Sequence, residues 1–193
     1  MKKGKLILIT GGSRSGKSTF AEKYALESKK RVFYLATAGA DDDEMRERIR
    51  IHQENRPADF ITVEEKLYPH RIIEKEQGEE TLFLLDCLTL LLTNHLLKDV
   101  GKDYEQGVNA NADDASLQNS AREALQYVEQ LVSVTQKSPS EILIVTNEVG
   151  MGLVPEYPLG RLYRDTAGRA NQIVAAAADE VWLMVCGLAQ RIK

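Results

Sequence analysis

The hydrophobic pattern of the chain consists of five short apolar runs separated by segments with helical periodicity. Each run is nearly continuous in apolar residues, which is typical of strands buried on both faces of a parallel sheet. The runs are KLILIT around Leu6, RVFYLAT around Phe33, TLFLLD around Leu84, EILIVTN around Ile144 and EVWLMVCG around Leu183. Helical spacing predicts helices over residues 17–29, 42–55, 88–98, 116–136 and 161–178.

This alternation predicts an α/β fold, with a mostly parallel sheet covered by helices on both faces. The functional residues of such a sheet gather at the carboxyl ends of its strands. The length of 193 residues suits one domain over residues 1–193. One polar stretch without apolar periodicity, residues 98–120, predicts a surface loop.

Composition and charge narrow the class of protein. The net charge of −4 argues against a duplex nucleic-acid partner, which normally meets a basic surface. No apolar stretch is long enough to cross a bilayer or to form the core of a signal peptide, so we expect a cytoplasmic protein. Cys87 and Cys186 follow no metal-ligand spacing, and we expect both to be small buried residues.

A glycine-rich motif, GGSRSGKST, follows the first apolar run directly. Gly11, Gly16, Lys17 and Ser18 fit the pattern G-x-x-x-x-G-K-[ST], with the required strand before it and helix after it. In this pattern backbone N–H groups surround phosphates, the lysine reaches the β- and γ-phosphates, and the hydroxyl binds Mg²⁺. The predicted triphosphate-binding residues are Gly11, Gly12, Ser13, Arg14, Ser15, Gly16, Lys17 and Ser18.

A phosphate loop of this kind also needs a carboxylate near the metal, usually at the end of another buried strand. Asp86 ends the run LFLLD and follows four apolar residues directly, so it is the preferred metal-side acid. Glu148, after ILIVTN, is a second candidate and is expected near the site. Either carboxylate also suits a turn or a helix N-cap, because both stand where a strand ends.

Several classes of phosphate-loop protein compete. DTAG at residues 165–168 imitates an element of switch GTPases, but it follows LGRLYR rather than a buried strand, and no guanine-binding N-K-x-D motif is present. A DNA-dependent ATPase would need a basic loop with aromatic residues. A small-molecule kinase is the main alternative.

His52, in the stretch RIRIHQENRP, is one of three histidines. In a helix over residues 42–55, Met45, Ile49 and His52 share one face. Pro57 then ends the helix shortly after the histidine. This position alone favours a packed histidine, because phosphoryl transfer needs no histidine nucleophile.

The chain resembles the bifunctional adenosylcobinamide kinase / adenosylcobinamide-phosphate guanylyltransferase family. The resemblance covers nearly the whole chain and rests on the order of ITGGSRSGKS, YLATA, DDEMRERIRIHQENRP, LLDCLT, LIVTNEVGMGLVP and RLYRDTAGRANQIVAAAADEVWLMVCG. It implies a recombinase-like phosphate-loop fold and a homotrimer. The chain departs from the family around residues 104–119, and it has Ile51 where some members carry a second histidine.

The resemblance implies two reactions. A nucleoside triphosphate, ATP or GTP, phosphorylates adenosylcobinamide, and GTP then transfers GMP to adenosylcobinamide phosphate. The second reaction passes through a guanylyl-histidine, and the family's nucleophile falls on His52. Imidazole suits this role because much of it is neutral near pH 7. Lys17 and Mg²⁺, held by Ser18 and Asp86, are expected to stabilise the leaving pyrophosphate.

The resemblance also implies nucleotide contacts outside the phosphate loop. These residues are Ala36, Thr37, Ala38, Gln53, Glu54, Asn55, Arg56, Glu64 and Asp86. Arg56 suits a phosphate by its charge, although it also suits a solvated helix end. Arg161, Arg164 and Arg169 form a cluster for which a phosphate across a subunit boundary and a surface salt-bridge face stay open as alternatives.

Overall fold

The computed structural model describes residues 3–39, 43–54, 56–98 and 114–193, with side chains omitted at positions 44, 45, 48, 49, 52, 53 and 114. The five predicted strands are confirmed and belong to one seven-stranded sheet of order β3-β2-β4-β5-β1-β6-β7. Their bounds are Leu6–Gly11 (β1), Arg31–Ala36 (β2), Thr81–Asp86 (β4), Glu141–Val145 (β5) and Glu180–Val185 (β6). All neighbouring pairs are parallel except β6 and β7.

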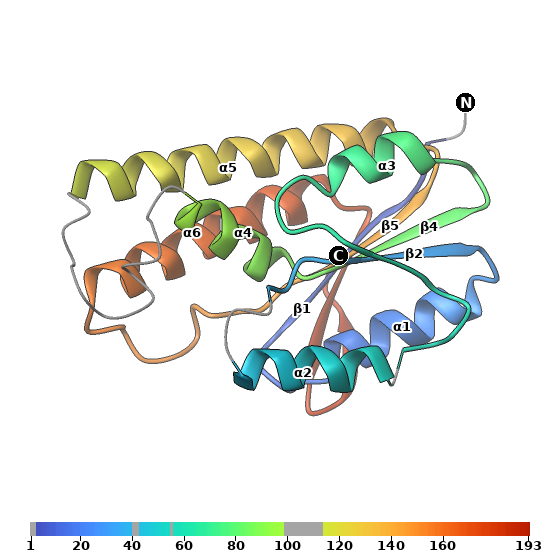
Figure 1. Ribbon diagram of the computed structural model, residues 1–193, viewed down its shortest axis with the longest axis horizontal. Helices are drawn as coiled ribbons and strands as arrows, with labels where there is room; N and C mark the ends of the chain where they lie inside the picture. The colour runs from blue at the N-terminus through green and yellow to red at the C-terminus, as the bar shows by residue number, and fades with distance from the viewer. Residues whose placement is uncertain (1–2, 40–42, 55, 99–113) are drawn as a thin grey trace.

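Helices cover both faces of the sheet, as the sequence predicts (Figure 1). On one face lie α1 (Lys17–Glu27) and α2 (Asp43–Glu54). On the other lie α3 (His70–Glu76), α4 (Leu88–Leu97), α5 (Asp114–Lys137) and α6 (Pro158–Ala177). Within the described residues, no helix combines the length and the apolarity needed to cross a membrane.

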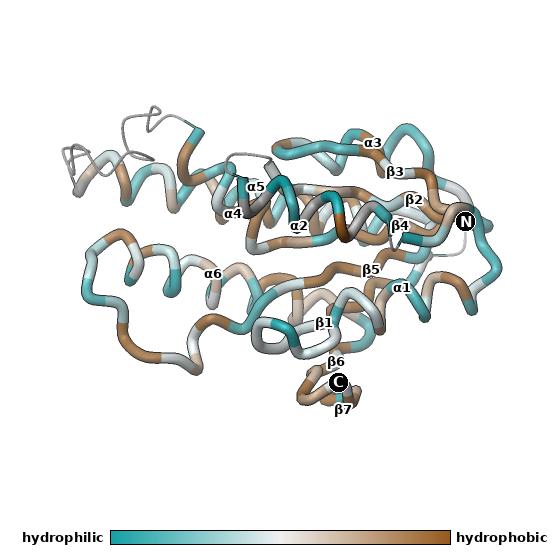
Figure 2. Tube along the Cα trace, turned by 60° about the horizontal axis from the view of Figure 1, so that its bottom comes forward, coloured by the Kyte–Doolittle hydropathy of each residue, from teal (hydrophilic) through white to brown (hydrophobic). Residues whose placement is uncertain are grey.

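The continuous apolar runs are explained by burial on both faces. In β1, Leu6 and Leu8 pack in the core beneath α3–α6, whereas Ile7 and Ile9 pack in the core beneath α1. Successive side chains of a strand point to opposite faces, so both positions must be apolar when both faces are covered. The strands accordingly form a hydrophobic centre between more polar helices (Figure 2).

Two edge strands and one short helix were missed. The strands are β3 (Ile61–Glu64) and β7 (Leu188–Arg191), and the helix is α3. Both strands have four residues, and their side chains are mostly exposed, so neither produces an apolar run. The predicted loop over residues 98–120 is wrong for residues 114–120, which form the first turns of α5, and residues 99–113 lie outside the described residues.

The prediction for the cysteines is half right. Cys87 is buried, whereas Cys186 is exposed. Cys186 (φ 51°) and Gly187 (φ 79°) form the two-residue turn between β6 and β7. Positive φ at both central positions matches the right-handed twist of the flanking strands, and it places the thiol at the tip of a hairpin. The apolar run around Leu183 therefore ends before Cys186.

Candidate functional site

The phosphate loop lies between β1 and α1 and is held in a conformation that requires glycine. Gly11 has φ 151°, and a Cβ there would lie 2.4 Å from the Met184 carbonyl oxygen and 2.8 Å from Ser15 Oγ. Gly16 has φ 95°, and a Cβ there would lie 3.2 Å from Gly187 Cα. Only glycine tolerates these conformations next to backbone. The loop conformation is therefore fixed by the strand and turn packed behind it.

Lys17 begins α1 and is only 8% exposed. Its Nζ donates a hydrogen bond to the Gly12 carbonyl oxygen at 2.6 Å, so the ammonium lies over the loop itself. Burial lowers the pKa of Lys17, and the nearby Cys87 and Asp86 partly oppose this effect. A buried ammonium beside the backbone N–H groups of the loop suits an anionic ligand. The charge of such a ligand would stabilise the ammonium, which burial otherwise disfavours.

Two hydroxyls of this region are buried without a hydrogen-bond partner among the described residues. They are Thr10 Oγ1, at the end of β1, and Ser15 Oγ, inside the loop. Buried hydroxyls normally have a partner, and an unpaired one often marks a ligand or a water. For Ser15 a phosphate oxygen is a suitable acceptor, because the residue belongs to the loop.

Asp86 ends β4, which is separated from β1 only by β5. The Asp86 carboxylate is close enough to Lys17 for its charge to raise the pKa of the lysine, so it lies beside the phosphate loop. Ser18 follows Lys17 in the first turn of α1. A hydroxyl and a carboxylate are hard oxygen ligands that suit Mg²⁺, which typically takes one or two protein ligands and completes its shell with phosphates and water. No cluster of three acidic, histidine or cysteine side chains suited to a metal occurs in the described part of the chain.

The segment after β2 is fixed against the end of β4. The Thr37 backbone N–H donates to the Asp86 carbonyl oxygen at 3.1 Å. The Thr37 hydroxyl accepts from the Cys87 N–H and donates to the Cys87 carbonyl oxygen, both at 2.8 Å. Burial, and next the Asp86 charge, raise the pKa of the Cys87 thiol to about 11, which makes it a poor nucleophile near pH 7.

Strand pairing brings three of the predicted contacts into one row. Ala36 is directly opposite Glu64 of β3 on one side and opposite Asp86 of β4 on the other. These strand ends converge at the same edge of the sheet as Gly11 of β1 (Figure 1). Positions 36–38, 64 and 86 are thus near one another, although they are far apart in the sequence.

Arg56 connects to this row through a residue that the sequence analysis missed. Its guanidinium carbon lies 3.6 Å from the centre of the Tyr34 ring, and its Nη1 donates to Thr62 Oγ1 at 2.8 Å. Its Nε is buried without an acceptor in the described residues. The Tyr34 hydroxyl donates to Asp86 Oδ2 at 2.8 Å. The available signal was a tyrosine inside an apolar strand, because a buried phenol needs a polar partner.

The predicted nucleophile is carried by α2. His52 lies in the last turn of this helix, but its side chain and that of Gln53 are outside the described set, as is the whole of Asn55. The proposed face of Met45, Ile49 and His52 therefore stays a prediction. Glu54 is exposed and pairs with Arg50 at 2.5 Å.

Glu148 lies beside the phosphate loop. Its backbone N–H donates to the Gly11 carbonyl oxygen at 3.0 Å, and its carboxylate accepts from the Gly150 N–H at 3.0 Å. The loop that follows projects large apolar side chains into solvent, with exposed fractions of 84% for Met151 and 95% for Leu153. Glu148 is thus near the site, as expected, with its carboxylate turned toward its own loop.

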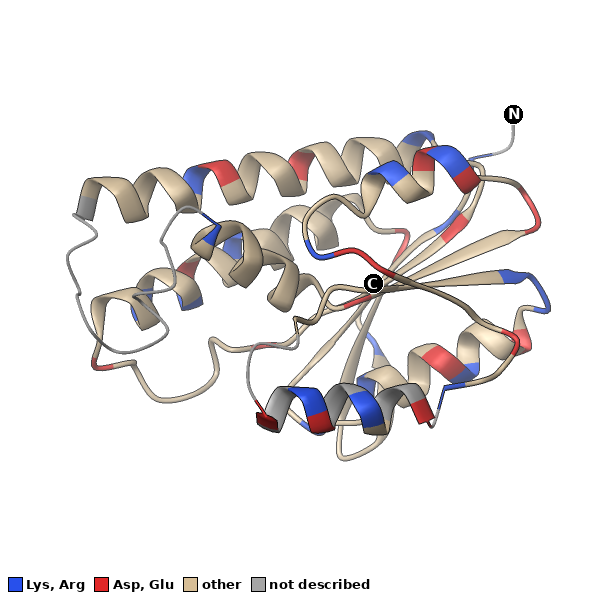
Figure 3. Cartoon of the chain, in the orientation of Figure 1, with Lys and Arg blue, Asp and Glu red and all other residues tan. Residues whose placement is uncertain are grey.

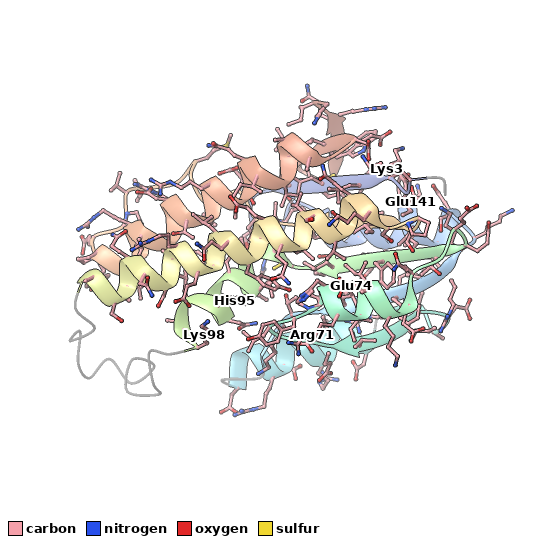
Figure 4. The ribbon with its side chains drawn as sticks, turned by 90° about the horizontal axis from the view of Figure 1, so that it is seen from above. Lys3, Arg71, Glu74, His95, Lys98 and Glu141 are labelled. Atoms are coloured by element: carbon pink, nitrogen blue, oxygen red, sulfur yellow. The ribbon has the colours of Figure 1, made fainter. Side chains whose placement is uncertain are left out.

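The other two histidines are buried beneath α5. His70 Nδ1 is 3.0 Å from the Tyr127 hydroxyl, and His95 Nε2 is 2.8 Å from the Leu67 carbonyl oxygen. The His95 and Tyr127 rings stack with centroids 4.1 Å apart. Burial lowers the pKa of both histidines. Figure 4 shows His95 on α4 near Arg71 of α3, in the layer opposite α1 and α2.

The three arginines of α6 differ from one another. Arg161 donates to the carbonyl oxygens of Pro155 and Glu156, at 2.9 and 2.6 Å. Arg164 pairs with Asp165 at 2.8 Å, and Arg169 is exposed. The first two therefore serve the local structure of this chain, which favours the surface interpretation for them.

The chain matches known proteins over nearly its full length. The family model described as "Cobinamide kinase / cobinamide phosphate guanyltransferase" matches residues 7–192. The "Bifunctional adenosylcobalamin biosynthesis protein CobU" of Escherichia coli (strain K12) is 42% identical over 97% of this chain and 99% of its own length. Its namesake from Salmonella typhimurium (strain LT2) is also 42% identical, over the same shares of the two chains.

One solved structure shares the fold at low sequence identity. It is titled "Structural study of Project ID PH0250 from Pyrococcus horikoshii OT3" and aligns with a TM-score of 0.55, 8% identity and coverage of 100% of this chain and 88% of that one. At this identity the likeness concerns the fold alone. The sequence matches decide the family: the chain belongs to the cobinamide kinase / cobinamide phosphate guanyltransferase family of bifunctional enzymes in adenosylcobalamin biosynthesis.

Proposed function

We propose that this enzyme phosphorylates adenosylcobinamide with ATP or GTP, and then transfers GMP from GTP to adenosylcobinamide phosphate through a guanylyl-His52 intermediate. The main support is the family match over residues 7–192, which includes both the phosphate loop and the histidine-bearing helix. Both reactions break a phosphoanhydride bond of a nucleoside triphosphate, so one phosphate site serves both.

In the kinase reaction, the hydroxyl oxygen of adenosylcobinamide attacks the γ-phosphorus and its proton passes to solvent. The bond between the γ-phosphorus and the bridging oxygen breaks, and the nucleoside diphosphate leaves. Lys17 and the backbone N–H groups of residues 11–16 hold the phosphates and stabilise the charge that develops on the leaving oxygen. The loop conformation enforced at Gly11 and Gly16 keeps these groups in place before the substrate arrives.

In the guanylyl transfer, a neutral imidazole nitrogen of His52 attacks the α-phosphorus of GTP. A P–N bond forms, the bond to the β-phosphate oxygen breaks, and pyrophosphate leaves. A phosphate oxygen of adenosylcobinamide phosphate then attacks the same phosphorus, the P–N bond breaks, and the product is adenosylcobinamide-GDP. Covalent catalysis divides one difficult transfer into two displacements, and the histidine returns to its neutral form.

We propose that Ser18 and Asp86 hold Mg²⁺ together with the substrate phosphates. The support is chemical, because a hydroxyl and a carboxylate are available at the loop and at the end of β4. When bound, Mg²⁺ supplies positive charge to the phosphate oxygens. Contacts to the nucleotide from residues 36–38, Glu64 and Arg56 are part of the same proposal, supported by their convergence at this edge of the sheet.

The decisive experiment is mass spectrometry of the intact protein after exposure to GTP. The proposal expects one added GMP on the peptide containing His52, stable in base and labile in acid, and none in His52→Ala. Ile51→Ala is the matched control, because it changes an exposed neighbour on the same helix. An unlabelled wild type with an active kinase would leave a plain small-molecule kinase as the function.

We also propose the homotrimer that the family resemblance implies. Large exposed apolar side chains such as Met151, Leu153 and Tyr157 are compatible with a subunit or ligand contact. Sedimentation equilibrium tests this assembly, with an expected mass three times the 21.6 kDa of one chain. A single species of 21.6 kDa with full activity would contradict it.

A further inference from the structure

We propose that Tyr34 is a positioning residue that couples the segment following helix α2 to the metal-side carboxylate Asp86. Its hydroxyl orients the carboxylate, and its ring face holds Arg56. The inference rests on the proposed function, because it assumes that Asp86 serves the metal and that α2 carries the nucleophile.

Strand pairing explains why these groups meet. Tyr34 of β2 is directly opposite Thr62 of β3, so both side chains lie on the same face of the sheet. Ala36, two residues further on, is opposite Asp86 of β4. Residues two apart on a strand share a face, so Tyr34 and Asp86 are diagonal neighbours, within reach of a long side chain.

Tyr34 makes both contacts at once. It is 3% exposed, its hydroxyl donates to Asp86 Oδ2 at 2.8 Å, and its ring lies 3.6 Å from the Arg56 guanidinium carbon. A buried phenol has few rotamers, so the two contacts fix one side chain at both its ring and its hydroxyl. A carboxylate held from outside the metal shell keeps its orientation, and loss of such a partner commonly weakens metal binding.

Arg56 is two residues beyond the end of α2, at Glu54. Its cation–π contact with Tyr34 and its hydrogen bond to Thr62 Oγ1 fix the position of Arg56, just after the helix that carries His52. A cation–π contact between a partly buried arginine and a buried ring is strong enough to favour one position of such a segment. The position of the C-terminal end of α2 and the orientation of the Asp86 carboxylate therefore depend on the same tyrosine.

The charges around the ring fit this arrangement. Glu22 of α1 faces the same region: burial, and next the Asp86 charge, raise its pKa, and Arg56 lowers it. Arg56 thus offsets the repulsion between two carboxylates as well as contacting the ring. If Arg56 moves away from the Tyr34 ring, Glu22 and Asp86 lose a nearby positive charge.

Two substitutions separate the two contacts. Tyr34→Phe keeps the ring for Arg56 and removes the hydrogen bond to Asp86, whereas Tyr34→Leu removes both. We expect Tyr34→Phe to bind metal about tenfold more weakly while reaching near wild-type guanylylation of His52 at saturating metal. We expect Tyr34→Leu to show the same metal defect and, in addition, a guanylylation rate about tenfold lower at saturating metal.

Metal binding is measured directly by electron paramagnetic resonance of Mn²⁺, with the protein and an α,β-methylene analogue of GTP. Guanylylation is followed by intact mass at saturating Mg²⁺. Tyr24→Phe is the matched control, because its hydroxyl also donates to a carboxylate, Glu141 Oε1 at 2.8 Å, at a different place in the fold. This control is expected to match the wild type in both measurements.

Wild-type Mn²⁺ affinity in Tyr34→Phe, or equal guanylylation rates for Tyr34→Phe and Tyr34→Leu at saturating metal, would overturn the inference. Asp86→Asn distinguishes this failure from that of the proposed function. If Asp86→Asn loses Mn²⁺ affinity and Tyr34→Phe does not, only the role of Tyr34 is wrong. If neither variant changes Mn²⁺ affinity, the metal assignment of Asp86 fails first.

Discussion

The phosphate loop is fixed on several sides by backbone, whereas helix α2 is a charged helix on the surface of the same sheet face. A Cβ at Gly11 would collide with the Met184 carbonyl at 2.4 Å. On α2, Arg50 pairs with Glu47 and Glu54 of its own helix, and positive and negative side chains alternate along it (Figure 3). The phosphate loop is thus preformed, whereas the predicted nucleophile, His52, is carried by a separate surface helix.

The proposed chemistry gives this difference a reason. Both proposed reactions use the triphosphate group of a nucleotide, so one rigid loop serves both. The histidine must reach the α-phosphorus in one reaction, and it must leave the γ-phosphorus open to the corrinoid hydroxyl in the other. A surface helix seated at one end by Arg56 on Tyr34 meets this demand better than a buried strand.

The largest expected effect comes from removing Lys17, the charged side chain of the phosphate loop. Lys17→Ala removes the buried ammonium above the loop and is expected to lower both the kinase rate and the guanylylation rate by at least about 1,000-fold. Lys23→Ala is the control, because Lys23 lies on the same helix and is exposed. Near wild-type rates of either reaction in Lys17→Ala would contradict a shared phosphate site.

A glycine substitution tests the rigidity of the loop. Gly11→Ala is expected to lower the free energy of unfolding by about 2–4 kcal/mol, because its Cβ meets backbone and its φ of 151° is strained for alanine. Gly12→Ala, with no atom within 4 Å of the added Cβ, is expected to change it by less than about 1 kcal/mol. Urea unfolding followed by circular dichroism measures both, and equal losses would show that the loop is not held as described.

The two buried histidines, His70 and His95, are expected to make the stability of the fold depend on pH. Burial lowers the pKa of His70 and His95 in the folded protein, so the unfolded chain binds more protons below about pH 6.5. Stability should therefore fall as the pH drops from about 6.5 toward the lowered pKa values, with a decrease of a few degrees in Tm by about pH 5.

The groups that surround this pair also carry charge. Glu65, Arg71 and Glu74 act on His70, and Lys98 acts on His95. His95→Gln removes one titrating ring and is expected to flatten the pH profile between about pH 5 and 6.5 in calorimetry. An unchanged profile in that variant would show that the dependence comes from other groups.

The smallest expected effect tests the helix side of the comparison. Arg50→Ala removes two ion pairs of α2, and both lie on exposed side chains. Exposed pairs contribute little, so no resolvable change in the unfolding midpoint or the kinase rate is expected. Thermal unfolding and a coupled kinase assay measure these, and intact mass after GTP exposure measures guanylylation. A large loss of guanylylation would mean that these pairs position α2.

Most of the fold could be predicted because the buried strands need apolar residues on both faces. The five central strands and the helices α1, α2, α4, α5 and α6 follow from this periodicity. The edge strands β3 and β7 have no buried face that demands a pattern, and α3 is only seven residues long. The rejection of DTAG as a switch element agrees with its position inside α6.

The site was predictable in parts. The phosphate loop is visible because its glycines and lysine are contiguous, and Asp86 is visible because it ends an apolar run. Tyr34 was missed, since a tyrosine within an apolar run resembles any core residue until its partner is known. The roles of His52 and of the nucleotide contacts stay predictions, and the experiments above test them.

The sequence by itself determined the order of the five buried strands and of the five longer helices, the phosphate loop and the family, because these depend on local periodicity and contiguous motifs. Only the tertiary structure decided which strands are neighbours and which side chains share a face. Parallel pairing of β3, β2 and β4 places Thr62, Tyr34 and Asp86 on three adjacent strands. Contacts between residues 22 to 52 positions apart depend on packing, and no local pattern encodes them.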